Sequence, residues 1–193
     1  MRNPLGPDTS AFLDDVEEST KVKAVMEICE KVKNNKRSDG ECSKVVIASA
    51  KPWSVTELLW RITKKYGKGH VVAITATQSA QEKLEAIEKL QNDDNVWVAV
   101  CSLGSVGTGV ELQRADHIVL FDLTHEWKTV VQLGGRIDRR SQHAKQCFFY
   151  MLYNSASSFD RSMHQSLLFK MRAEQAMMAQ SVREGPVVYA KWY

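Results

Sequence analysis

Short, continuously apolar segments recur along this chain and constrain its fold more than any other feature. Three of them are Val45–Ala48, Val71–Ile74 and Val96–Cys101, and two more fall near 117–121 and 145–152. Most neighbouring positions within each segment are apolar, so apolar and polar side chains do not alternate. This pattern is typical of parallel β-strands that are covered on both faces. The sequence therefore predicts a parallel sheet between layers of helices.

Amphipathic helical patterns separate the apolar segments. These patterns cover 20–33, 55–66, 80–90 and 127–138, and a long, Met-rich helix begins near 157. Ser79 is well placed to cap the helix over 80–90. Strands and helices thus alternate, and right-handed crossovers between parallel strands place helices on the sheet. The fold class we predict is α/β, with a single doubly wound, mainly parallel sheet flanked by helices.

The length of 193 residues suits one domain with tails. Residues 1–18 carry prolines and an acidic run, which indicates an N-terminal arm or linker, and the alternating pattern occupies 19–178. Residues 179–193 form a C-terminal tail, for which an edge strand and a linker are the alternatives. No stretch is long and apolar enough to cross a membrane, and the N-terminus has no apolar signal core.

Charge and cysteine content set weak limits on function. The net charge of +3 permits a nucleic-acid partner without requiring one. The basic run Lys33–Arg37 is interpreted as solvated surface, with contact to phosphates as the alternative. The four cysteines have no paired spacing, so no metal site is predicted, and a reducing compartment is favoured.

Two further patterns indicate a site for a polyanion. Gln132, Arg136 and Arg139 are spaced so that one helical face would carry all three, and paired guanidiniums suit phosphate oxygens. Gly107 and Gly109 allow a backbone to approach a ligand closely. In open α/β sheets, ligands gather at the carboxyl ends of the strands, and these segments follow such ends.

These segments resemble the motifs of one enzyme family. Gly107-Thr-Gly-Val-Glu-Leu112 resembles helicase motif V, and Lys44–Ser49 is similar to motif IV. Gln132–Gln142 resembles motif VI of superfamily-two helicases, Gln-x-x-Gly-Arg-x-x-Arg, in the variant of the Swi/Snf-type ATPases, which are double-stranded DNA translocases. The resemblance runs over about 19–178. It implies the RecA-like C-terminal lobe of such an enzyme.

The resemblance also implies roles around a nucleotide. Arg136 and Arg139 would be arginine fingers that neutralise charge developing during phosphoryl transfer. Gly107, Gly109 and Gln132 would lie against the nucleotide or order the loops around it. Glu111 stands where RNA-helicase relatives have Asp, so it would accept hydrogen bonds from ribose hydroxyls; ordering of its own loop is the alternative.

Four further residues are implied to contact nucleic acid. Ser49, Lys51, Ser102 and Thr108 would donate to DNA phosphates, as sequence-independent contacts do. The partner implied is double-stranded DNA, with nucleosomal DNA as one form of it. The location implied is the nucleus, and otherwise the cytoplasm.

The ATP site is expected to be only half present. The chain has no Gly-x-x-x-x-Gly-Lys-Ser/Thr phosphate loop and no Asp-Glu pair after a strand. An N-terminal RecA-like lobe would therefore hold most of the ATP and Mg²⁺, and this lobe alone would not hydrolyse ATP. Two alternatives remain open: a non-catalytic helicase-like module that binds nucleic acid or protein, and the lobe of an RNA helicase.

Overall fold

A computed structural model describes most of the chain. The residues described are 13–14, 17–35, 37, 40–106, 110–137, 144, 146–178 and 187–189, with side chains described up to 173.

The centre of the molecule is a six-stranded sheet. Its strands are β1 (Val45–Ser49), β2 (Val71–Ile74), β3 (Val98–Ser102), β4 (His117–Leu120), β5 (Cys147–Met151) and β6 (Val187–Tyr189). Their order across the sheet is β2-β3-β1-β4-β5-β6, and every pair of neighbours is parallel. The predicted doubly wound, parallel sheet is confirmed, and β1 lies in its interior.

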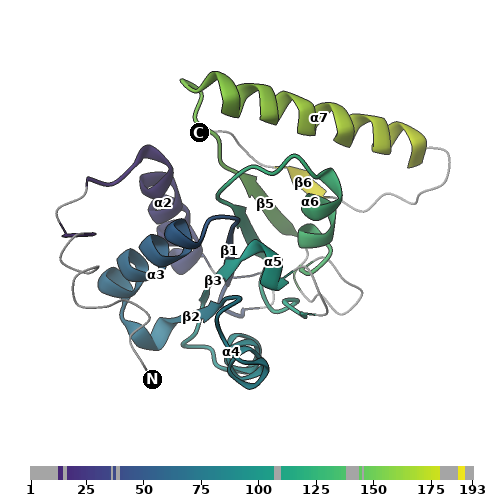
Figure 1. The fold of residues 1–193 in the computed structure, drawn as a ribbon. Helices are drawn as coiled ribbons and strands as arrows, with labels where there is room; N and C mark the ends of the chain where they lie inside the picture. Colours follow the sequence, from purple (N-terminus) through teal and green to yellow (C-terminus); the bar gives the residue numbers. More distant parts are fainter. Residues whose placement is uncertain are drawn as a thin grey trace.

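Helices cover both faces of this sheet (Figure 1). They are α2 (Thr20–Asn34), α3 (Pro52–Tyr66), α4 (Ala80–Asn92), α5 (Leu103–Val106), α6 (Trp127–Gly134) and α7 (Ser158–Met178), with the 3₁₀ turn η1 (Lys68–His70). One hydrophobic cluster joins α2 and α3 to the sheet, and another joins α4, α5 and α6 to the opposite face. None of the helices described has both the length and the apolar composition needed to span a membrane.

The strands show why a continuous apolar run was the right signal. Val45 and Ile47 of β1 pack into the cluster under α2 and α3, whereas Val46 and Ala48 pack into the other cluster. All four side chains have 0% exposure. Because successive side chains on a strand point to opposite faces, both faces must be apolar when both are covered.

Local signals set several helix ends, and the cap predicted at Ser79 is confirmed. The Ser19 hydroxyl accepts from the Val22 amide and caps α2. Ser79 and Glu82 form a reciprocal capping box at the start of α4. Gly67, with φ of 93°, follows the last residue of α3, where a left-handed conformation favours glycine.

The helix predicted over 127–138 is shorter in the structure. Helix α6 ends at Gly134, and 135–137 form a turn in which the Gly135 amide donates to the Val131 carbonyl over 2.9 Å. Two successive glycines are poor helix formers and favour a stop here. Arg136 therefore lies in this turn, and the single helical face expected for it and Gln132 is not formed.

Two other predicted boundaries differ from those in the structure. The helix marked by 55–66 begins at Pro52, where proline suits the first helical turn. Within the tail predicted at 179–193, β6 pairs with β5 along the edge of the sheet, which agrees with the edge-strand alternative.

Candidate functional site

The carboxyl edge of the sheet brings together residues that are far apart in sequence. Ser49 at the end of β1 is the register partner of Ser102 at the end of β3, and β4 ends on the other side of β1. From β1 the chain runs through α3 to β2, whereas from β4 it runs through α6 to β5, in the opposite direction. Such a topological switch point is where open α/β sheets hold ligands.

A buried carboxylate occupies this switch point. Asp122 follows β4 and accepts a hydrogen bond from the Ser49 hydroxyl, which comes from the end of β1. The Lys51 amide donates to the Ser49 hydroxyl oxygen over 3.2 Å, and the Lys51 ammonium lies 3.7 Å from the Asp122 carboxylate. Ser49 is fully buried, whereas 73% of the Lys51 side chain is exposed. The cluster therefore presents one mobile cation over a fixed anion.

A second carboxylate lies beside this cluster. Asp160, in the first turn of α7, accepts from the Asn154 amide over 2.8 Å and pairs with Lys21 of α2 at 2.9 Å. Burial by itself would raise the pKa of Asp160, but these partners, with Lys51 nearby, lower it below its usual value. The pair fastens the starts of α2 and α7 next to the switch point.

The glycine-rich segment leaves β3 through the short helix α5. The hydroxyls of Ser102 and Ser105 lie 2.7 Å apart, and Ser102 is half-buried. Gly107, Thr108 and Gly109, which were predicted to contact the nucleotide or DNA, lie outside the described residues.

A main-chain hydrogen bond joins the segments that resemble motifs V and VI. The Leu112 amide donates to the Arg136 carbonyl over 3.2 Å, and the Leu112 side chain is fully buried. Glu111 is exposed, and its carbonyl accepts from the Gln91 side-chain amide over 2.7 Å. The two segments are thus joined by at least this one hydrogen bond between their backbones.

Of the two arginines predicted as arginine fingers, Arg136 lies within the described residues and Arg139 lies outside them. Arg136 is half-buried, and its amide donates to the Leu133 carbonyl over 3.1 Å. Gln132 is exposed on α6. The backbone of Arg136 is therefore held by hydrogen bonds at both its amide and its carbonyl.

Sequence reasoning missed three residues of the site. None of Asp122, Lys21 and Asp160 was among the site residues predicted from the sequence. For Asp122, a carboxylate that ends an apolar strand was the available signal; for the Lys21–Asp160 pair no local signal existed.

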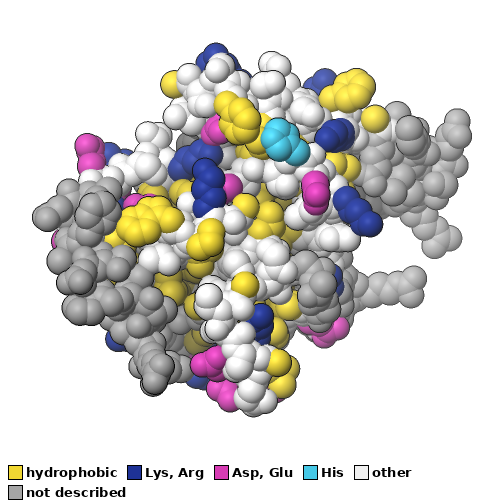
Figure 2. Space-filling model, in the orientation of Figure 1, with side chains coloured by type: hydrophobic (Ala, Val, Ile, Leu, Met, Phe, Trp, Pro, Cys, Tyr) yellow, Lys and Arg dark blue, Asp and Glu magenta, His cyan; other side chains and the backbone are white. Residues whose placement is uncertain are grey.

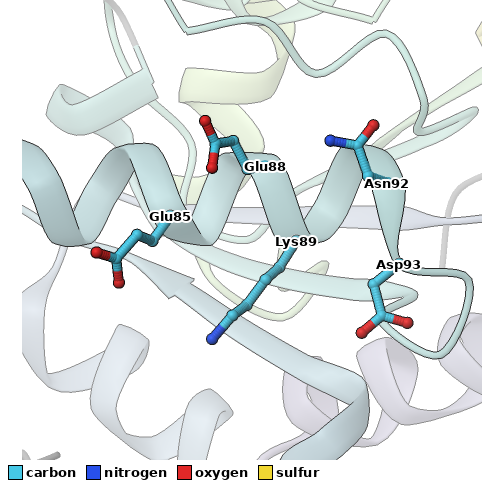
Figure 3. Close-up of a pocket in the computed structure, with 5 residues that line it drawn as sticks. All are labelled: Glu85, Glu88, Lys89, Asn92 and Asp93. Carbon is cyan, nitrogen blue, oxygen red and sulfur yellow. The ribbon is translucent and has the colours of Figure 1, made fainter.

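A shallow hollow on the outer side of α4 is lined by Glu85, Glu88, Lys89, Asn92 and Asp93 (Figure 3). This hollow lies away from the carboxyl edge, and no predicted site residue lines it. Figure 2 shows basic, acidic and hydrophobic side chains mixed over the upper part of the face in view. Among the described residues, no three His, Cys, Asp or Glu side chains are grouped so as to hold a metal ion.

Comparisons with known proteins agree on the fold. The family model described as "Helicase conserved C-terminal domain" matches residues 20–141. A crystal structure of the C-terminal part of the Fun30 ATPase domain aligns with 84% of this chain and 47% of its own, at 18% identity and a TM-score of 0.68. The Sulfolobus solfataricus SWI2/SNF2 ATPase C-terminal domain aligns over 91% and 67%, at 20% identity and a TM-score of 0.56.

The chain is shorter than the protein chains in both of these structures. The chain spans about half of the Fun30 structure and about two thirds of the Sulfolobus one. The search of curated proteins found no match.

Proposed function

This chain belongs to the family of helicase conserved C-terminal domains, and from that premise we propose that it is the second motor lobe of a Swi/Snf-like, ATP-dependent double-stranded DNA translocase. The lobe would span about residues 19–178, with 1–18 as an arm. An N-terminal RecA-like lobe of the same protein would complete the ATP site. That N-terminal lobe would hold most of the ATP and the Mg²⁺, and the metal ion would supply positive charge next to the phosphates.

The observation that carries this proposal is the form of the carboxyl edge. Polar and charged side chains from separate strands meet at the topological switch point, where the Lys51 side chain is largely exposed to solvent. A site that is open in one lobe and closed by a second suits phosphoryl transfer, because the reacting phosphates must be positioned and shielded from water. The absence of a phosphate loop from the sequence supports the same division of labour.

Arg136 is the residue to which we assign the charge neutralisation, together with Arg139. Its backbone is held by hydrogen bonds to Leu112 and Leu133, so the guanidinium extends from a fixed turn. A pre-positioned guanidinium costs little reorganisation when charge develops on the phosphoryl oxygens. Gln132, exposed one turn before it, would contact the nucleotide or its loop, and Gly107 and Gly109 would approach it.

The nucleic-acid track would use the other predicted residues in two ways. Lys51, Ser102 and Thr108 would donate to phosphates of the DNA backbone. Ser49 is fully buried and its hydroxyl donates to Asp122, so its part would be to hold Lys51 and Asp122 in place. Contacts of this kind predict weak sequence preference and strong dependence on salt.

The test replaces Arg136 in the longer, two-lobed polypeptide. Arg136→Ala should leave ATP binding nearly intact and lower DNA-stimulated turnover by at least about a hundredfold, because an arginine finger contributes about 10³ to 10⁵ in rate. Steady-state ATPase rates and nucleotide affinity would both be measured. Arg172→Ala, at an exposed position of α7, serves as the matched control. Turnover of Arg136→Ala within threefold of the parent would overturn the assignment.

One alternative keeps a specific observation in its favour. The Glu111 side chain is exposed, as a carboxylate that accepts from ribose hydroxyls must be. Stronger stimulation of the parent ATPase by RNA than by duplex DNA would therefore favour an RNA helicase lobe. A parent without ATPase activity under any nucleic acid would favour a binding module.

A further inference from the structure

Lysines gather at the edge of the molecule opposite to the candidate site. α2 and α3 both end at this edge, and α3 ends shortly before β2 begins. The exposed lysines in the last turns of these helices and in η1 are Lys31, Lys33, Lys64, Lys65 and Lys68. We call this set the amino-edge lysine cluster.

Contacts between the two helices hold the cluster together. The ammonium groups of Lys33 on α2 and Lys65 on α3 lie 5.3 and 5.2 Å from the centre of the Tyr66 ring. The Tyr66 hydroxyl donates to Glu30 over 2.9 Å, and Lys65 pairs with the same carboxylate at 2.7 Å. Lysines from two helices are thus brought to one aromatic ring, which places like charges side by side.

The cluster keeps an excess of positive charge. Lys65 pairs with Glu30 and Lys64 with Asp14, whereas Lys33 and Lys68 have no ion-pair partner among the described residues. Lysines near helix C-termini complement the helix dipole, which accounts for part of their placement. Lys68, however, lies in η1 beyond the end of α3. The dipole of α3 therefore does not account for the placement of Lys68.

The surroundings of the cluster favour a nucleic acid over a protein. Protein interfaces are depleted in lysine and need apolar anchors at their centre. The large exposed hydrophobic residues that the structure describes all lie outside the cluster; they are Trp53, Leu84, Val131, Phe159 and Phe169. Interfaces with nucleic acids are more polar and more positively charged.

We propose that the amino-edge lysine cluster binds the phosphate backbone of nucleic acid, as a second contact apart from the carboxyl edge. The basic run at 33–37 contributes Lys33 to this surface, but Arg37 does not belong to it. Arg37 is 7% exposed, and its guanidinium donates to the Arg114 carbonyl over 3.3 Å.

The test measures binding of the 193-residue chain to duplex DNA as a function of salt. Replacing Lys33, Lys64 and Lys68 with Gln should lower affinity at least tenfold at about 0.1 M salt. The slope of log affinity against log salt should fall by about two to three units, since each lost phosphate contact removes about 0.9. Lys65 is kept because its partner Glu30 also accepts from the Tyr66 hydroxyl, and this contact joins α2 to α3.

Matched variants separate local binding from total charge. A control variant replaces Lys23, Lys83 and Lys89 with Gln, which removes the same charge from other surfaces. The slope of log affinity against log salt should change by less than one unit in this variant. Equal losses in both triple variants would overturn the proposal. Replacing Lys33, Lys64 and Lys68 with Arg should retain affinity, because phosphates accept from guanidinium as well.

A measurement without mutation guards against misfolded variants. Saturating duplex DNA should protect the lysines of the cluster from acetylation more than Lys83 and Lys89. Unchanged acetylation, or equal protection by polyglutamate, would overturn the proposal, and the latter would indicate an acidic protein partner. The proposal does not rest on ATP hydrolysis, so its failure leaves the Arg136 test intact, and the reverse also holds.

Discussion

Lys44 is the charged residue with the most unusual surroundings. It precedes β1, has 0% exposure, and donates from its side chain to the carbonyls of Leu90 and Asp93 over 2.8 and 2.7 Å. Those carbonyls end α4, where helical partners are missing. The Lys44 amide and the Ser43 hydroxyl both donate to Asp116, over 2.9 and 2.8 Å. One residue therefore satisfies buried acceptors from two other elements.

This residue gives stability a dependence on pH. Burial lowers the pKa of Lys44 from 10.5 to about 8. Between these values the unfolded chain binds more protons than the folded chain, so stability rises with pH. We expect a gain of about 2 kcal/mol between pH 7.5 and 9.5. Neutral lysine keeps two N–H donors, so both carbonyl bonds can persist.

The measurement is urea unfolding of the parent and of Lys44→Met across this range. The pH-dependent gain should be absent from Lys44→Met, and identical profiles for the two proteins would refute it. Other buried groups act in the opposite direction in both proteins, so the Lys44 effect is the difference between the two profiles. Burial raises the pKa of Cys29 and Cys101, so these thiols lower the stability of the folded chain above about pH 8.5, where the unfolded thiols ionise. Burial also raises the pKa of Tyr66, which lowers stability above about pH 10.

The placement of site residues could be predicted for those that stand at the ends of apolar strands. Ser49, Lys51 and Ser102 follow apolar strands, and their meeting at the carboxyl edge was expected and is found. Asp122 carried a signal, as a carboxylate directly after an apolar strand, but its pairing with Ser49 could not be predicted because the two residues are 73 positions apart. Lys44 could not be recognised as buried either, since lysine is almost always solvated.

At the scale of elements, helix α6 shows how periodicity can extend too far. Helical spacing continues through Gln132 and Arg136, but Gly134 and Gly135 end the helix. The turn that follows is set by the bond from Leu112 to Arg136, a contact between distant segments. Periodicity reports only local spacing, so it cannot reveal such a contact.

The predicted N-cap of helix α4, Ser79, can be tested by mutation. The Glu82 amide donates to the Ser79 hydroxyl, and the Ser79 amide donates to the Glu82 carboxylate over 2.8 Å. Ser79→Ala should lower the free energy of unfolding by about 1 kcal/mol, because a helical N–H loses its acceptor. Ser79→Asp should retain most of it. Ser166→Ala, exposed within α7, is the control and should cause no loss in urea unfolding.

For the whole molecule, the sequence predicts the class of sheet but not the order of its strands. Val45–Ala48 and Val96–Cys101 are both apolar throughout, so neither run shows which neighbours it will have. The order follows from which helix crosses which face, and this depends on packing between distant segments. The predicted tail contains β6, whose pairing with β5 has no local signature beyond its apolar residues.

The last prediction concerns the edge strand β6. A chain that ends at Met178 lacks β6 and leaves one side of β5 unpaired. We expect it to lose about 1–3 kcal/mol of stability in urea unfolding, from several main-chain hydrogen bonds. Sedimentation should also show self-association, because open strand edges pair with one another. A chain that ends at Tyr189 is the control. Equal stability of the two chains would show that β6 contributes nothing.

The interior position of β1 has a consequence for the order of events during synthesis. β1 leaves the ribosome before any of its neighbours, since β3 begins at Val98 and β4 at His117. Until those residues emerge, the most buried strand of the finished protein has both of its edges open. The nascent chain must therefore extend past His117 before the centre of this sheet can close, and this interval is when aggregation competes with folding.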